Sequence, residues 1–116
     1  MNGDPDLTLW YGSLLIGHIR NPFCSDATWH GTIDRVVDPN RSEIARRVTN
    51  YMDFCADWNE RTRNDPANAP DAAEFVQYAD LLSSQVWLTK SSNGERRSIV
   101  DAPVFFVGGE ISWRLS

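Results

Sequence analysis

The sequence predicts an α+β fold in which an antiparallel or mixed sheet of five to seven strands carries an αα-hairpin on one face. Short β-branched and aromatic runs occupy both ends of the chain, and two amphipathic segments occupy its middle. No alternation of strands with helices is present, as a parallel sheet would require. The expected order of elements is therefore βββ-αα-βββ(β).

Length and composition favour a single globular domain spanning residues 1–116, with residues 1–6 as a disordered tail. Hydrophobic residues make up 41% of the chain and five are tryptophan, which excludes an intrinsically disordered protein. The formal net charge is −5, and the basic residues are scattered or paired with acids in the sequence. We therefore expect no nucleic-acid partner, because such a partner requires clustered positive charge.

The N-terminus is acidic, whereas a secretion signal is basic and then apolar, and no apolar run approaches the ~20 residues of a membrane span. These features predict a cytoplasmic protein with no membrane partner. In a reducing compartment Cys24 and Cys55 are expected to remain free thiols.

The first strands are predicted at residues 7–11 and 14–19, since Gly12 and Ser13 between them have the composition of a tight hairpin turn. A third strand is predicted at residues 28–37, which contain Thr, Trp, Ile and Val. Gly31 within it indicates a bulge or a close approach of another backbone.

A long helix is expected after Asp38-Pro39-Asn40, where Asn40 and Glu43 resemble a capping box. The predicted core-facing stripe recurs at helical spacing and consists of Ile44, Val48, Tyr51, Met52, Cys55 and Trp58.

Two prolines, Pro66 and Pro70, end that helix, and Asp71 with Glu74 begins a second one. The stripe of this second helix is predicted to comprise Phe75, Tyr78, Ala79 and Leu82. The pair is expected to form an αα-hairpin.

The C-terminal part predicts two more hairpins. Residues 85–90 and 96–100 flank Asn93-Gly94, the dipeptide that favours a type I′ turn, and residues 104–107 and 111–115 flank two glycines. Pro103 favours an edge strand or a strand start. The sheet residues expected in the core are Leu9, Leu15, Ile33, Val86, Leu88, Phe105 and Trp113.

Reactive side chains gather in one segment, where His18, Cys24, Asp26 and His30 are the candidate catalytic residues. A thiolate with imidazoles could act as a nucleophile and base, or could ligate zinc. The spacing matches no metal signature, so neither a metal nor a cofactor is predicted. The alternative to catalysis or metal binding is that the two histidines lie at the surface around a buried thiol and have no chemical role.

Aromatic residues support a binding role instead. Neighbouring strand residues point to opposite faces, so adjacent aromatic pairs such as Trp10 and Tyr11 cannot share one packed layer. An exposed patch containing Trp10, Trp29, Trp87 and Arg20 would bind a protein partner or a second copy of the chain. His18 and Arg20 share one strand face, where they could clamp an anion or simply lie in solvent.

Two functions are therefore predicted from the sequence. The first is a non-enzymatic protein-binding or regulatory module that could self-associate. The second is a small hydrolase-like or ligand-binding domain that uses the Cys/His/Asp cluster.

Overall fold

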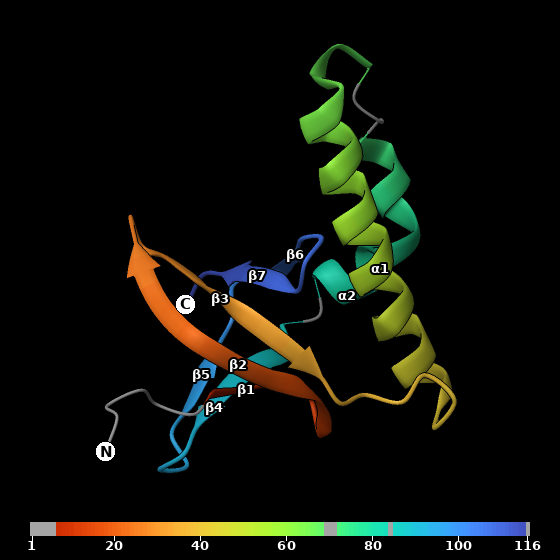
Figure 1. Ribbon diagram of the computed structural model, residues 1–116. Helices are drawn as coiled ribbons and strands as arrows, with labels where there is room; N and C mark the ends of the chain where they lie inside the picture. The colour runs from red at the N-terminus through yellow and green to blue at the C-terminus, as the bar shows by residue number, and fades with distance from the viewer. Residues whose placement is uncertain (1–6, 69–71, 84, 116) are drawn as a thin grey trace.

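A computed structural model describes residues 7–68, 72–83 and 85–115. The predicted tail at residues 1–6 and the predicted helix start at Asp71 lie outside the described residues. The fold is α+β, as predicted: a seven-stranded antiparallel sheet stands beside a pair of helical segments that lie side by side and extend well beyond it (Figure 1). The order of strands and helices along the chain matches the prediction.

The sheet has the strand order β5-β4-β1-β2-β3-β7-β6, and every neighbouring pair is antiparallel. Its strands are β1 (Leu7–Tyr11), β2 (Leu14–Ser25), β3 (Thr28–Arg35), β4 (Trp87–Ser91), β5 (Arg96–Ser98), β6 (Val104–Phe105) and β7 (Glu110–Trp113). Pro103 immediately precedes the edge strand β6, as its missing N–H favours.

The sheet curls back on itself just beyond β5 and β7. Ile99 forms an antiparallel bridge with Leu115, and the backbone N–H of Val100 donates to the carbonyl oxygen of Arg114 at 2.8 Å. Because β5 and β7 are first and sixth in the strand order, this contact closes the sheet into an incomplete barrel. The sequence did not predict this closure.

Two irregularities shape the long strand β2. Its pairing with β1 shifts register between Leu9 and Trp10, so that Ile16 is left without a partner in β1. Ile16 is fully buried while His18 is exposed, although strict alternation would place both side chains on one face.

The second irregularity lies opposite Gly31, where pairing with β3 shifts between Arg20 and Phe23. A Cβ at Gly31 would lie 2.8 Å from Ile19 Cγ2 and 3.1 Å from the carbonyl oxygen of Arg20. The predicted close approach at Gly31 is confirmed. Only glycine leaves room for the backbone of β2 at this point.

Helix α1 (Glu43–Asn64) has Ser42 as its N-cap, because the Ser42 hydroxyl accepts a hydrogen bond from the N–H of Ala45 at 3.1 Å. The predicted capping box at Asn40 was wrong. Asp38 instead accepts from the N–H of Asn40 at 2.9 Å and forms a turn before the helix. The predicted end is confirmed, since α1 stops before Asp65 and Pro66.

The apolar stripe of α1 is largely as predicted. Val48, Tyr51, Met52 and Cys55 are buried, whereas Ile44 is 38% exposed and Ala45 is buried in its place. Tyr51 packs against Trp87 and Phe105 of the sheet, with ring centroids 6.1 and 5.9 Å away.

The second helical segment differs from its prediction. After the short 3₁₀ turn η1 (Pro66–Asn68), residues Ala72–Tyr78 form a 3₁₀ helix, η2, and only Ala79–Leu82 form an α-turn, α2. A 3₁₀ helix repeats every three residues, so Phe75, Tyr78 and Leu81 face inward while Ala79 is exposed. Leu81, which was not in the predicted stripe, is fully buried.

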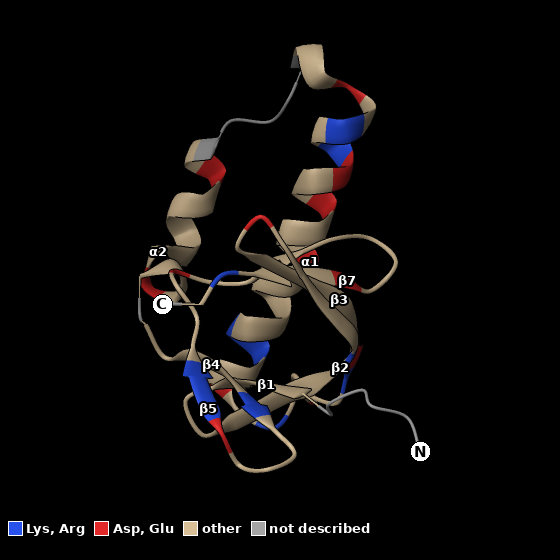
Figure 2. Ribbon diagram, turned by 90° about the vertical axis from the view of Figure 1, so that its left-hand side faces the viewer, with Lys and Arg blue, Asp and Glu red and all other residues tan. Residues whose placement is uncertain are grey.

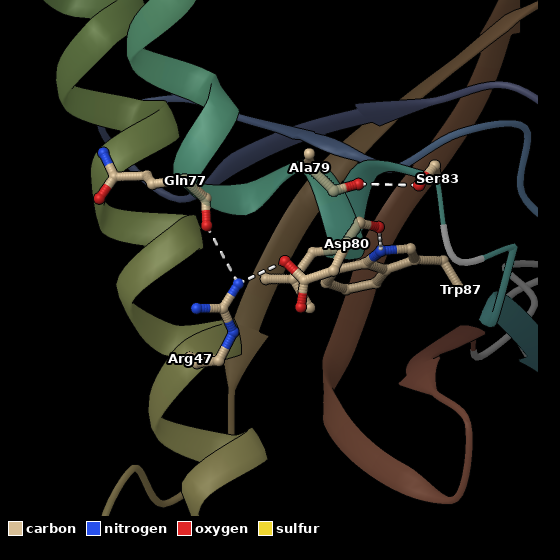
Figure 3. Close-up of polar contacts among 7 residues, drawn as sticks. Arg47, Gln77, Ala79, Asp80, Ser83 and Trp87 are labelled. Atoms are coloured by element: carbon tan, nitrogen blue, oxygen red, sulfur yellow. Dashed lines mark hydrogen bonds and ion pairs between the residues drawn. The ribbon is translucent and has the colours of Figure 1, made fainter.

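A group of polar contacts joins this segment to α1 and β4 (Figure 3). The Arg47 guanidinium on α1 donates to the carbonyl oxygen of Gln77 at 3.1 Å and forms an ion pair with Asp80. The Trp87 indole N–H, at the start of β4, donates to the carbonyl oxygen of Leu81 at 2.9 Å. These bonds fix α2 to both its neighbours.

The core contains Leu9, Ile33, Phe105 and Trp113, as predicted. The other three residues predicted in the core are not fully buried, since Leu15 and Leu88 are half-buried and Val86 is 37% exposed. Their neighbours in the sequence, Ile16 and Trp87, are fully buried instead.

The hairpin around Asn93-Gly94 is confirmed, but its predicted turn type is wrong. Only Gly94 has positive φ, at 88°, whereas a type I′ turn requires it at two residues. The Gly94 N–H donates to the Ser91 carbonyl oxygen, and the Ser91 N–H donates to that of Glu95, which makes a three-residue loop. Within the described part of the chain, no helix is long and apolar enough to cross a membrane.

Candidate functional site

The four predicted catalytic residues are not brought together. Cys24 is paired with Trp29, while its neighbour Phe23 is paired with His30, so the Cys24 thiol and the His30 ring lie on opposite faces of the β2–β3 hairpin. His18 lies six residues before Cys24 along the same strand, roughly 20 Å away at the usual strand rise. A catalytic centre built from these groups has no geometric basis here.

Asp26 lies in the hairpin turn, where it and Ala27 both have positive φ, at 52° and 66°. This is the conformation of a tight two-residue turn, in which Asp is tolerated because its short side chain suits left-handed backbone. Asp26 therefore shapes the hairpin. The described residues contain no group of three or more His, Cys, Asp and Glu side chains that could hold a metal ion.

Arg20 is engaged by its own sheet. Its Nε and one terminal nitrogen donate to the two carboxylate oxygens of Asp34, at 2.5 and 3.2 Å. His18 is paired with Asp34 across the two strands. The positive charge of Arg20 is thus compensated by Asp34, which leaves no free anion clamp at this pair.

The predicted aromatic binding residues lie in three different places. Trp87 is fully buried and packs in the core, so it cannot contact a partner in this conformation. Trp10 is half-buried, with Lys90 Nζ 3.9 Å from its ring centroid. Trp29 stacks on Trp113, with centroids 6.1 Å apart, and lines a separate hollow of about 230 Å³.

A more coherent surface lies on the outside of β2, β3, β6 and β7. One hollow of about 290 Å³ is lined by Phe23, His30, Thr32, Phe106 and Glu110 among others. A second hollow of about 290 Å³ continues from it toward α1 and is lined by Asn59, Glu60, Arg63, Phe106, Val107 and Glu110. Phe106 and Glu110 belong to both, and we call the two together the outer groove.

Each part of this groove is lined by one exposed apolar side chain, Phe23 in the first hollow and Val107 in the second. Phe23 is 57% exposed and stacks on His30, with ring centroids 5.1 Å apart and planes inclined by 27°. Val107 is 56% exposed in the turn between β6 and β7. An apolar side chain of a partner could therefore be buried at either end.

Local structure holds both ends of the outer groove in place. The bulge opposite Gly31 sets the position of Phe23, as described above. The β6–β7 turn is tied to the sheet because the Ile33 N–H donates to the Gly109 carbonyl oxygen at 2.7 Å. Asn59 on α1 donates to the Phe105 carbonyl oxygen at 3.1 Å, which fixes the helix against β6.

Sequence reasoning missed the main groove residues. Phe23 follows Pro22, and a proline is normally evidence against a strand, so the second predicted strand ends at residue 19. In the structure β2 runs through this proline to Ser25 by means of the bulge. Phe106 and Val107 were predicted to lie in a strand, whereas β6 ends at Phe105.

Charges of both signs are interspersed along α1 and across the sheet (Figure 2). Among the described residues, five arginines make ion pairs with carboxylates, namely Arg20, Arg35, Arg47, Arg61 and Arg97. In comparisons with known proteins, no family model, curated sequence or solved structure matches this chain.

Proposed function

We propose that this chain is a protein-binding module whose outer groove takes an apolar segment of a partner protein. The observation that carries the proposal is Phe23, a large apolar side chain that is 57% exposed yet held in one orientation by stacking on His30. Exposed aromatic side chains on a rigid support are favourable anchors, because little conformational entropy is lost when a partner covers them.

Charge around the groove supports a particular kind of partner. Two acidic residues, Glu60 and Glu110, and one basic residue, Arg63, line the groove. The whole chain also carries a formal charge of −5. A partner segment with an apolar anchor and a neighbouring basic residue would therefore be attracted, whereas two copies of this chain would repel each other.

The same charges support a protein partner over a nucleic acid. The formal charge of −5 and the ion pairing of Arg20, Arg35, Arg47, Arg61 and Arg97 with carboxylates both weaken the attraction for a phosphate backbone. We further propose that the module works in the cytosol. The two free cysteines, Cys24 exposed and Cys55 buried, suit a reducing compartment.

Selection from a displayed library of random peptides tests the proposal. We expect enriched peptides that carry a large apolar residue beside Lys or Arg. Phe23→Ser and Val107→Ser should each weaken the selected peptides by about tenfold, since an interface anchor contributes more than ~1 kcal/mol.

Val76→Ser is the matched control, because Val76 is 76% exposed on η2 and lies outside the groove. Its affinity for the peptides should equal that of the unmodified chain. An equal loss in all three variants, or selected peptides that bind the Phe23→Ser variant unchanged, would contradict the proposal. Light scattering that shows a dimer broken by Phe23→Ser would replace the proposed partner with a second copy.

A further inference from the structure

A hollow larger than either part of the outer groove lies at the seam between the helical hairpin and the C-terminal strands. It has a volume of about 460 Å³, within the range of about 300–1,000 Å³ typical of small-molecule sites. Four aromatic residues line it, namely Tyr51, Trp58, Phe75 and Trp113. We call it the seam pocket; none of the outer-groove hydrophobic residues Phe23, Phe106 and Val107 lines it.

Three polar side chains of the seam pocket, those of Tyr51, Cys55 and Asn59, already have partners, whereas the buried indole N–H of Trp58 has none among the described residues. The Tyr51 hydroxyl donates to the Pro103 carbonyl oxygen at 2.9 Å. The Cys55 sulfur accepts from the N–H of Phe105 at 3.3 Å, and burial raises the pKa of the thiol. Cys55 is thus a structural thiol, and the inner part of the pocket favours an aromatic occupant.

Two opposite charges line the same pocket at its exposed side. Asp101 and Arg114 both have exposed side chains, and neither forms an ion pair with any residue in the described ranges. The residue before Asp101 is bonded to Arg114, because the Val100 N–H donates to the Arg114 carbonyl oxygen at 2.8 Å. An anion and a cation that form no ion pair therefore line the same aromatic cavity.

The backbone explains how Asp101 lines this cavity together with its neighbour Val100. In a regular strand their side chains would point to opposite faces. Asp101 has a φ of 59°, in the left-handed region, which breaks the alternation. Asp tolerates this left-handed conformation, as it does at Asp26.

We propose that the seam pocket binds an aromatic amino acid. The ring enters among Trp58, Phe75 and Trp113, the ammonium group faces Asp101, and the carboxylate faces Arg114. Asn59 lines both the seam pocket and the outer groove, but none of the residues assigned to the ring, the ammonium group or the carboxylate lines the groove, so either proposal can fail without the other.

Isothermal titration with four probes tests the inference: phenylalanine, 3-phenylpropionate, phenethylamine and glycine. We expect phenylalanine to bind most tightly, each single-charge analogue to bind about threefold more weakly, as for an exposed ion pair, and glycine not to bind. Phenylalanine should also raise the melting temperature.

Charge variants at exposed positions then separate the two contacts without threatening the fold. Arg114→Gln should weaken 3-phenylpropionate but not phenethylamine, and Asp101→Asn should do the reverse. Arg96→Gln, an exposed position on β5 outside the pocket, should change neither affinity. No heat of binding for any aromatic probe at about 10 mM, or equal effects of both variants on both analogues, would overturn the inference.

Discussion

The indole N–H of Trp87 donates a hydrogen bond to the backbone carbonyl oxygen of Leu81 at 2.9 Å, and both side chains are fully buried. This single bond joins the last helical turn to the first residue of β4 (Figure 3). It orients a fully buried tryptophan of the core, on which Tyr11 and Tyr51 pack.

Trp87→Phe should therefore lower the free energy of unfolding by about 2–3 kcal/mol, because the substitution leaves a cavity and removes the hydrogen bond between the indole N–H and Leu81. Urea denaturation followed by circular dichroism measures the change. Trp10→Phe is the comparison, since Trp10 is half-buried, and should cost less than about 1 kcal/mol. Equal losses for the two variants would mean that the Trp87 bond contributes nothing distinctive.

The two glycines of the central strands, Gly17 and Gly31, should differ in how much stability is lost when each is replaced by alanine. A Cβ at Gly17 would lie 2.5 Å from the Asp34 carbonyl oxygen, whereas the nearest atom to a Cβ at Gly31 is a side-chain carbon of Ile19 at 2.8 Å. Because backbone yields less easily than a side chain, Gly17→Ala should cost about 3 kcal/mol and Gly31→Ala about 1–2 kcal/mol. Thermal unfolding of both variants checks the order, and the reverse order would contradict this packing.

The two thiols should differ sharply in reactivity. Cys24 is exposed, whereas Cys55 is 2% exposed and its pKa is raised by burial. Iodoacetamide at pH 8 should alkylate Cys24 within minutes and leave Cys55 intact until denaturant is added. Mass spectrometry of the Cys24→Ser variant gives the decisive reading: rapid alkylation of that variant without denaturant would show that Cys55 is accessible.

Stability should fall in alkaline solution because of Tyr51. Burial, with smaller contributions from Cys55, raises the pKa of this hydroxyl far above its ordinary value of 10.0. Below pH 10 both folded and unfolded chains keep this proton. Above it the unfolded chain loses the proton and the folded chain retains it, so stability falls as pH rises, by about 1.4 kcal/mol at pH 11.

Tyr51→Phe isolates this effect from other titrating groups. At pH 7 the variant should be about 1–2 kcal/mol less stable, because the Pro103 carbonyl oxygen loses its donor. Between pH 9 and 11, however, its stability should fall less steeply than that of the unmodified chain. Parallel stability profiles, obtained by urea titration at each pH, would show that Tyr51 does not titrate in this way.

Local patterns explain what could be predicted from the sequence. The hairpin at Gly12, the long stripe of α1 and its end before Pro66 all depend on residues close in the chain, and each is confirmed. The missed features depend on distant partners or on backbone irregularity. The bulge that buries Ile16 moved Leu15 out of the core, and no periodicity reveals a bulge in advance.

The candidate sites were harder to predict for the same reason. Cys24 and His30 are near in sequence, but strand alternation separates them. Phe23 and Val107 are far apart in sequence, and they border one groove only because β3 pairs with β7. Likewise Asp101 and Arg114 line one pocket because the sheet curls back on itself, which no local pattern encodes.

The position of β1 inside the sheet, with a neighbouring strand on each side, also affects how fast the chain can fold. This first strand pairs with both β2 and β4, and Thr8 bonds to the Lys90 carbonyl oxygen, 82 residues away. The β1–β3 meander and α1 can form from nearby contacts, but docking β4 must close that long loop first. We expect refolding to be slow for a chain of this length, limited by the arrival of β4 at an N-terminal meander already in place.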